Sequence, residues 1–459
     1  MAASQTTRFC PSARQGLPMT FVSDMLATVT RRSRQWIGWD QETTRRTPAD
    51  IVALADQLLS RRGEASGVAL ARDILSSYGA LDAKGRTAVL TAFAERFGAD
   101  HDKLKAAIAD YEADPTAAAA ARLSVAAEPR RQELIRRLNL APRGTLSLVR
   151  LREDLLKRLA GQPDLKVLDG DLVHLFSSWF NRGFLVVRRI DWSTPANILE
   201  KIIRYEAVHA IRDWDDLRRR LQPEDRRCFA FFHPQLDDEP LIFVEVALTA
   251  DLPDAIGPLI ADGGQPVPAD EARVAVFYSI SNCQEGLAGI SFGSFLIKQV
   301  VEELKRELPR LSTFVTLSPV PGFARWLAEE RTAEASSLSA EDRAALAVLD
   351  TPDWRADAAI AERTDKLLAR AAARYFVHAK SGGGRPRDPV ARFHLGNGAR
   401  LERINPGADL SASGLKQSHG VMVNYLYDLT RIEENHEAYA ERRQVVVSPA
   451  VKKLAAAKA

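Results

Sequence analysis

Cysteine is scarce in this 459-residue chain, which contains three, at Cys10, Cys228 and Cys283. They lie far apart and form no Cys-x-x-Cys pair, which argues against a cysteine-based zinc module and a disulfide framework. Histidine is also sparse, with eight residues and no HxH or HExxH spacing, so the sequence predicts no metal site. The small number of unpaired cysteines is most typical of a protein in a reducing compartment.

Long apolar runs are absent as well. No segment approaches the roughly 20 residues that span a bilayer, and the N-terminus lacks the compact apolar core of a secretory signal. We therefore expect a soluble cytoplasmic protein with no membrane partner. Residues 1–23 lack Asp and Glu and contain Arg8 and Arg14, which faintly resembles an organelle presequence. A disordered leader is the favoured reading of this segment, and organelle targeting stays open.

An excess of one charge is lacking too, because the formal net charge is +3. Such a balance does not indicate nucleic-acid binding, and basic runs such as Arg218 to Arg220 are expected to be solvated surface. With 46% apolar and 27% charged residues, the chain has the composition of a globular protein. Its length exceeds what one hydrophobic core usually serves, so two domains are expected.

The first domain is predicted to span residues 1–165 and to be helical. Apolar residues recur at helical spacing and β-branched runs are few. Thr47 followed by Pro48 is a typical helix start. Further helical stripes are predicted over 66–77, 86–97, 102–112, 117–138 and 145–159. Short connections predict that these helices pack as antiparallel neighbours.

The second domain is predicted to span residues 166–459 and to be α+β. Strands are expected over 229–232, 241–248, 274–280 and 421–427, with a hairpin turn at 237–240. The Ala-rich segment 328–376 is expected to be helical.

A glycine-containing loop follows the predicted strand 274–280. It carries Gly286, Gly289 and Gly293, and a helical pattern begins at Phe295. The N-terminus of a helix presents unpaired N–H groups that favour an anion, so this order is typical of a phosphate cradle in an acyl-CoA site. When the glycine loop is considered alone, the alternative to a phosphate cradle is that its glycines only allow tight packing of a strand-to-helix turn.

Two further side chains, Ser318 and His394, could carry chemistry. Ser318 lies between Leu317 and Pro319 in a loop that Pro321 and Gly322 would stiffen. A serine before proline is more often a turn former than a catalyst. His394 has Phe393 and Leu395 beside it, which predicts a strand residue, and a structural histidine is the simpler interpretation.

Two tyrosines, Tyr425 and Tyr427, share a face of their predicted strand. That face could present a phenol to a pocket, although core packing is the default.

Several long motifs in one order carry a resemblance over roughly residues 165–450. They are Glu206 to His209, Phe277 to Ser281, Gly286 to Gly293, Leu317 to Phe323, Phe393 to Gly398 and Asn424 to Tyr427. In these motifs the chain resembles the malonyl-CoA decarboxylase family. The resemblance implies an N-terminal helical domain that self-associates into a homo-oligomer. It also implies a C-terminal catalytic domain with the fold of the Gcn5-related N-acetyltransferases.

The resemblance assigns roles motif by motif. The coenzyme A phosphate loop falls on Ala288, Gly289, Ile290, Ser291, Phe292, Gly293 and Ser294. The catalytic serine falls on Ser318, the catalytic histidine on His394 and a supporting tyrosine on Tyr427. Malonyl-CoA is the implied substrate, Ser318 binds its carboxylate, and His394 protonates the α-carbon with a pKa expected near about 6.5.

Two departures from the family pattern stand out. Ser291 replaces a glutamate that some relatives have, which puts an accessory acid in doubt. Pro406 and Gly407 replace a tryptophan-containing segment, which is expected to alter the wall of the pocket.

The chemistry requires no cofactor beyond the coenzyme A of the substrate. An acyl-CoA-dependent N-acyltransferase is the enzymatic alternative, and a coenzyme A-responsive scaffold without turnover is the other.

Overall fold

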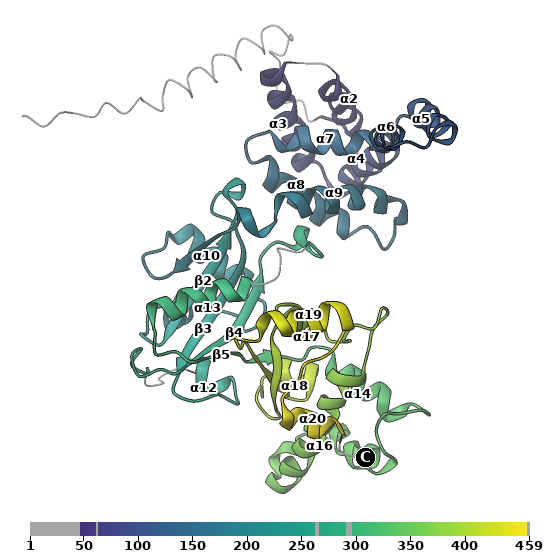
Figure 1. The fold of residues 1–459 in the computed structure, drawn as a ribbon. Coiled ribbons are helices and arrows are strands. Elements are labelled where there is room, and N and C mark those ends of the chain that lie inside the picture. The colour runs from purple at the N-terminus through teal and green to yellow at the C-terminus, as the bar shows by residue number, and fades with distance from the viewer. Residues whose placement is uncertain (1–45, 61–62, 262–265, 291–295, 457–459) are drawn as a thin grey trace, which may run out of the picture. The chain divides into compact units, whose positions relative to one another are not determined.

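The computed structural model describes residues 46–60, 63–261, 266–290 and 296–456. The chain divides into two compact units, one up to Leu175 and one from Phe176 onward (Figure 1). Residues 1–23 and Cys10 lie outside the described residues, whereas Cys228 and Cys283 are buried and unbridged. In the described ranges, no helix has the length and apolar content needed to cross a membrane.

The first unit is built from helices, as predicted. They are α2 (Pro48–Leu59), α3 (Glu64–Ala80), α4 (Ala83–Arg96), α5 (His101–Ala113), α6 (Ala117–Ala127), α7 (Arg130–Asn139) and α8 (Gly144–Leu156), followed by the start of α9 (Lys166–Trp179). Thr47 caps α2 in a capping box with Asp50, which confirms the predicted helix start. The single helix predicted over 117–138 is wrong, because Pro129 lies between α6 and α7.

The second unit contains an 8-stranded sheet with the order β1-β2-β3-β4-β5-β8-β6, and β7 pairs with β8 off this path. The strands are β1 (Val186–Ile190), β2 (Arg226–Phe232), β3 (Pro240–Thr249), β4 (Val274–Asn282), β5 (Thr313–Thr316), β6 (Ser318–Pro319), β7 (Arg400–Asn405) and β8 (Met422–Leu426). The four predicted strands are confirmed, and together with the helices they make the unit α+β.

Helices lie on both faces of the sheet. They are α10 (Ala196–Tyr205), α11 (Trp214–Leu221), α12 (Gly257–Ile260), α13 (Leu296–Glu307), α14 (Phe323–Thr332), α15 (Ala340–Ala345), α16 (Ala358–His378), α17 (Pro389–Gly396), α18 (Ala412–Ser418), α19 (Ile432–Arg442) and α20 (Pro449–Ala456). Helices α14 to α16 confirm the helical prediction for 328–376.

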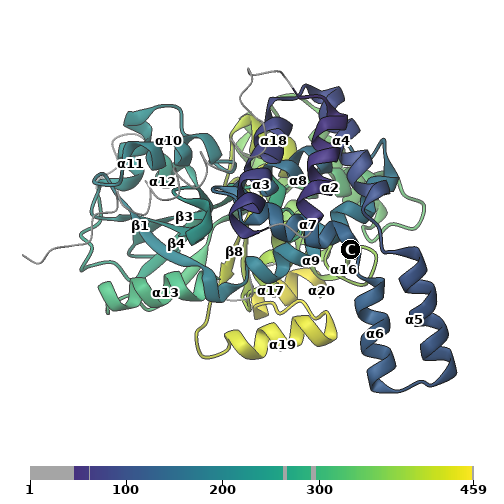
Figure 2. The same ribbon diagram turned by 90° about the horizontal axis from the view of Figure 1, so that it is seen from above.

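Alternation along β2 shows how its two faces are used. Cys228, Ala230 and Phe232 pack in one cluster with Ile202 of α10 and Leu217 of α11. The opposite face carries Arg227 and the buried Phe229 and Phe231, and the Arg227 guanidinium lies 2.7 Å from the Glu307 carboxylate at the end of α13. Figure 2 shows α10 and α11 on one side of the strands and α13 on the other.

The sheet opens between β4 and β5. These two strands run parallel, and their pairing ends at Phe277 and Thr316. Beyond this point the chain turns to β8, where Ser318 pairs with Val423. A register shift in the β3–β4 pairing lies beside the opening, and such irregularities bend a strand. The diverging strands leave a space at the middle of the sheet for side chains from other elements.

Candidate active site

Ser318 and His394 meet at the opening between β4 and β5. The Ser318 Oγ lies 3.1 Å from the His394 Nε2, although the residues are far apart in the sequence. Both are buried, with exposed fractions of 5% and 3%. A hydroxyl within hydrogen-bond distance of an imidazole is a pair that can bind a polar group and move a proton.

Ser318 is held by a very short strand. Its neighbour Pro319 pairs with Met422 of β8, and the fixed φ of proline limits movement here. The Ser318 Oγ also donates to the Thr316 Oγ1 at 2.8 Å, which in turn accepts from the Tyr425 N–H at 3.2 Å. The serine hydroxyl is therefore oriented from both the imidazole and the strand behind it.

His394 comes from helix α17, so the prediction that it is a strand residue is wrong. Asp388 caps this helix by accepting from the Ala391 N–H at 2.8 Å, and Pro389 occupies its first turn. An aspartate cap followed by proline is a strong helix start. The helix ends at Gly396, and Asn397 is its C-cap.

Two tyrosines fix the imidazole ring. The Tyr427 hydroxyl lies 2.8 Å from the His394 Nδ1. The Tyr425 ring stacks on the imidazole with a centroid distance of 4.5 Å and an interplanar angle of 24°. Both tyrosines thus face His394, as their spacing of two along one strand predicts. The structure brings Ser318, His394 and Tyr427 together in one hydrogen-bonded row.

The row is uncharged in the free protein. Burial lowers the pKa of His394 from 6.5 to about 3, because the desolvated imidazolium is disfavoured. The expected pKa near 6.5 is therefore wrong for the free protein. Burial also raises the pKa of the Tyr427 phenol well above its usual range, so this group stays protonated. With Tyr427 donating to Nδ1, the neutral imidazole carries its proton on Nε2 and donates to Ser318.

Ser318 and His394 line a cavity of about 250 Å³, here called the inner cavity. Most of its wall is apolar, and the full lining comprises Val208, Phe277, Tyr278, Ile280, Asn282, Ser318, Pro319, Pro389, Val390, Phe393 and His394. An apolar wall around a few convergent polar groups is typical of a small-molecule site.

A larger cavity of about 690 Å³, the outer cavity, adjoins the inner one. Asn282 and Phe393 line both cavities. Its wall includes Ala288, Gly289 and Ile290, the described part of the predicted phosphate loop. Gly289 has φ +79°, a conformation that L side chains rarely adopt. Ser291, Phe292, Gly293 and Ser294 lie outside the described residues.

Three arginines, Arg385, Arg392 and Arg443, line the same outer cavity. They come from the connector before α17, from α17 itself and from the end of α19, so no sequence motif groups them. Only the fold brings them together, and sequence reasoning named none of them. Their guanidinium groups give this cavity a wall suited to phosphate oxygens.

Other features bear on the predicted chemistry. No group of three or more His, Cys, Asp or Glu side chains is placed to hold a metal ion within the described ranges. Pro406 and Gly407 follow β7, and neither belongs to the wall of the inner or outer cavity. Sequence reasoning also missed Thr316 and Asp388, although Asp388 before Pro389 is a readable helix-start signal.

Two family models match the chain. The model of the malonyl-CoA decarboxylase C-terminal domain matches residues 183–459, and that of the malonyl-CoA decarboxylase N-terminal domain matches residues 97–180. Among curated relatives, the mitochondrial malonyl-CoA decarboxylase of Anser anser anser is 35% identical over 82% of this chain and 81% of its own length. The mitochondrial enzyme of Rattus norvegicus is 34% identical over 83% of this chain and 84% of its own length.

Solved structures agree with these matches. A malonyl-CoA decarboxylase from Rhodopseudomonas palustris is 61% identical, with a TM-score of 0.86 over 89% of this chain and 100% of its own. A malonyl-CoA decarboxylase from Agrobacterium vitis is 57% identical, with a TM-score of 0.85 over 88% of this chain and 99% of its own. Both likenesses extend over both units.

Proposed function

The chain belongs to the malonyl-CoA decarboxylase family, and from this premise we propose that it converts malonyl-CoA to acetyl-CoA and CO2 at the Ser318–His394 pair. One observation carries the assignment of the site. A serine and a histidine from distant motifs lie 3.1 Å apart in an apolar cavity that adjoins a larger basic one. The inner cavity takes the malonyl group, and the outer cavity takes coenzyme A.

Charge supports the placement of coenzyme A. Its phosphates are anionic, and Arg385, Arg392 and Arg443 line the outer cavity, where charge-assisted hydrogen bonds to phosphate are strong. Backbone N–H groups near Gly289 add donors. The pantetheine arm then passes between Asn282 and Phe393, which line both cavities, and delivers the thioester to Ser318.

Loss of CO2 breaks the bond between the α-carbon and the carboxylate and leaves an enolate on the thioester. The enzyme must orient the carboxylate and then supply a proton to the α-carbon. Ser318 lines the inner cavity, and in the free protein its hydroxyl donates to the Thr316 Oγ1. The hydroxyl can rotate and donate instead to the malonyl carboxylate when the substrate binds. The apolar wall excludes water, which strengthens each polar contact inside.

His394 supplies the proton as a neutral imidazole. Its pKa in the free protein is lowered to about 3, so an imidazolium is not the resting form. The enolate carbon holds a proton far more tightly than imidazole does, so transfer from Nε2–H is downhill. The Tyr427 hydroxyl, 2.8 Å from Nδ1, can pass its proton to the ring in the same step. The net reaction takes up one proton from solvent through the phenol.

The helical first unit is assigned a different role. We infer that it mediates self-association of the chain. Every residue that lines the inner and outer cavities comes from the second unit, which leaves the first unit available for assembly.

The first test is product formation by the purified protein from malonyl-CoA, without added acceptor or metal. Acetyl-CoA and CO2 in equal amounts are expected. Release of free coenzyme A would instead indicate thioester hydrolysis or acyl transfer, the N-acyltransferase alternative. Binding without any product would support the scaffold alternative.

Variants link the activity to the site. His394→Ala is expected to lower kcat by on the order of 10²–10⁴, the usual contribution of a positioned proton donor, with little change in malonyl-CoA binding. His378→Ala, at an exposed position at the end of α16, is the matched control and should retain turnover. Wild-type turnover in His394→Ala would remove this residue from the mechanism.

A further inference from the structure

A third cavity lies next to the inner one. Its volume is about 200 Å³, and we call it the rear cavity. It is lined by Ala207, Val208, His209, Pro319, Pro321, Asp409, Ser413, Gly414, Gln417, Ser418, Val421 and Met422. Val208 and Pro319 line both the rear and the inner cavity. These two side chains therefore form the partition between the two spaces.

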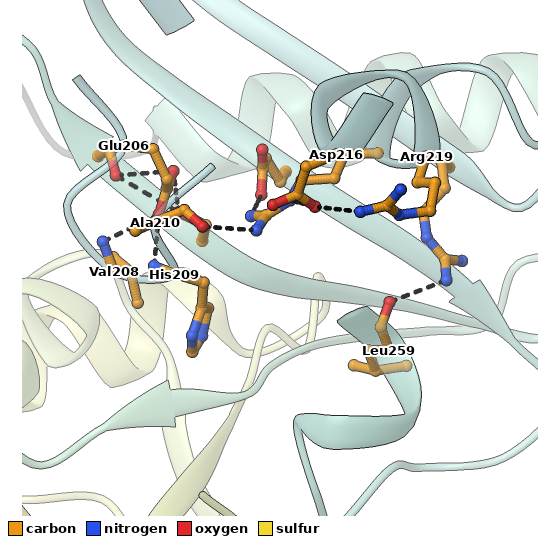
Figure 3. Close-up of polar contacts among 12 residues, drawn as sticks. Glu206, Val208, His209, Ala210, Asp216, Arg219 and Leu259 are labelled. Carbon is orange, nitrogen blue, oxygen red and sulfur yellow. Dashed lines mark hydrogen bonds and ion pairs between the residues drawn. The ribbon is translucent and has the colours of Figure 1, made fainter. Parts of the chain in front are cut away.

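The backbone that carries Val208 is firmly held (Figure 3). The buried Glu206 carboxylate accepts from the N–H groups of Val208 at 2.9 Å and His209 at 2.7 Å. The same carboxylate accepts from the hydroxyls of Ser279 at 2.8 Å and Ser281 at 3.2 Å on β4. A buried carboxylate with this many donors ties the loop to the strand that lines the inner cavity.

Arg220 holds the far end of the same loop, and it is buried, so the expectation of solvated surface is wrong for this arginine. Its Nη2 donates to the Ala210 carbonyl at 3.3 Å, while its Nη1 donates to the buried Glu245 carboxylate at 3.0 Å. On the other side of the partition, Pro319 is fixed by its ring and by pairing with Met422. Since both backbones are fixed, the size of the Val208 side chain decides how far the inner cavity extends.

The rear cavity can accept an alkyl group. Its fully buried lining includes Val421 and Met422, and both side chains are apolar. Burial lowers the pKa of His209 to about 4, so this imidazole is uncharged at neutral pH. The polar part of the lining comprises the exposed Ser413 and Gln417 together with the buried Asp409 and Ser418. An alkyl substituent that passed the partition would contact Met422, because Met422 pairs with Pro319 of the partition.

We propose that Val208 sets the largest substituent that the enzyme tolerates on the α-carbon of a malonyl thioester. This inference rests on the proposed function, because the α-carbon must lie between Ser318 and His394. Shortening Val208 joins the spaces of about 250 Å³ and about 200 Å³. The joined space gives a methyl or ethyl group on the α-carbon of a malonyl thioester more room than the inner cavity of the wild type does.

The test compares Val208→Ala with Val390→Ala. Val390 also lines the inner cavity but not the rear one, so its replacement removes the same two methyl groups without opening the partition. The readout is kcat/KM for ethylmalonyl-CoA divided by kcat/KM for malonyl-CoA. Val208→Ala is expected to raise this ratio by about 10- to 200-fold, the range for one methylene in an apolar pocket. Val390→Ala should raise it by less than about tenfold.

Equal ratios in the two variants would overturn the inference. If Val208→Ala fails to fold, Val208→Ile tests it in the opposite direction, because the larger side chain should lower the ratio for methylmalonyl-CoA below that of the wild type. An unchanged ratio in Val208→Ile would then count against the partition. Failure of the proposed function is a separate outcome, since the wild-type chain would then form no acetyl-CoA from malonyl-CoA.

Discussion

At the residue scale, the proposed mechanism depends on the protonation state of His394. The imidazole is buried in the second unit, where it contacts Ser318, Tyr425, Tyr427 and the Phe393 ring. None of these partners carries a charge, so nothing offsets the desolvation of an imidazolium. A proton donor that is neutral in the free protein has a kinetic signature different from that of an ordinary histidine.

The pH dependence of kcat/KM, which reports ionisations of the free enzyme, distinguishes the two cases. If catalysis uses neutral His394, kcat/KM should be flat between about pH 5 and 8. If the imidazolium were required, its pKa of about 3 would make kcat/KM fall tenfold per pH unit across the same range. A break near 6.5 would mean that burial does not lower the pKa as described.

Tyr427→Phe provides the companion variant for this profile. The phenylalanine keeps the ring but removes the hydroxyl that lies 2.8 Å from Nδ1. We expect a lower kcat, because the ring can no longer take a proton on Nδ1 as Nε2 releases one. Unchanged kcat in Tyr427→Phe would show that the phenol only orients the imidazole.

The sequence named three residues that the structure brings together, but it could not predict their protonation state. Ser318, His394 and Tyr427 were named from motifs, and the structure brings them together. The pKa of His394 depends on burial among side chains that are distant in the chain, and no local pattern encodes that. The same holds for Arg385, Arg392 and Arg443, which share a cavity but no motif.

At the element scale, helix α17 and the loop after Ser318 are coupled through one side chain. The Tyr375 hydroxyl on α16 lies 3.4 Å from the Asp388 carboxylate that caps α17. A Cβ added at Gly322 would lie 2.5 Å from the same hydroxyl. Tyr375 therefore contacts both the loop that follows Ser318 and the start of the helix that carries His394.

Gly322→Ala is expected to lower kcat, because the added methyl group must displace Tyr375 or the Ser318 loop. Adding Tyr375→Phe should restore much of the loss, since the next ring atom, Cζ, lies at an ordinary 3.7 Å from the same Cβ. Gly382→Ala is the control, because nothing lies within 4 Å of a Cβ there. Failure of the double variant to recover would show that Tyr375 is not the obstacle.

Helix α17 also shows where local reasoning fails. The order Phe393, His394, Leu395 alternates as a strand does, but three residues are too few to tell a period of 2 from one of 3.6. The decisive signal was Asp388 before Pro389, the same kind of start that was read correctly at Thr47 and Pro48. Long strands such as β3 and β4 were predictable because their apolar runs were long and bounded by turns.

At the scale of the whole molecule, the chain combines a helical unit with an α+β unit. The helical spacing in residues 1–165 and the strand patterns in residues 166–459 predicted this order, and the division into compact units falls within α9. The domain boundary near residue 165 and the role of the first unit in self-association stay predictions. All residues that line the inner, outer and rear cavities belong to the second unit.

This placement predicts that turnover per chain is independent of assembly. The purified protein would be diluted through the range in which sedimentation velocity shows its oligomers dissociating, and kcat per chain would be measured at each concentration. A constant kcat is expected, because one chain supplies every residue of the described cavities. A kcat that falls together with the oligomer would mean that a second chain completes or stabilises the site. The self-association role of the first unit would then be part of catalysis and not only of assembly.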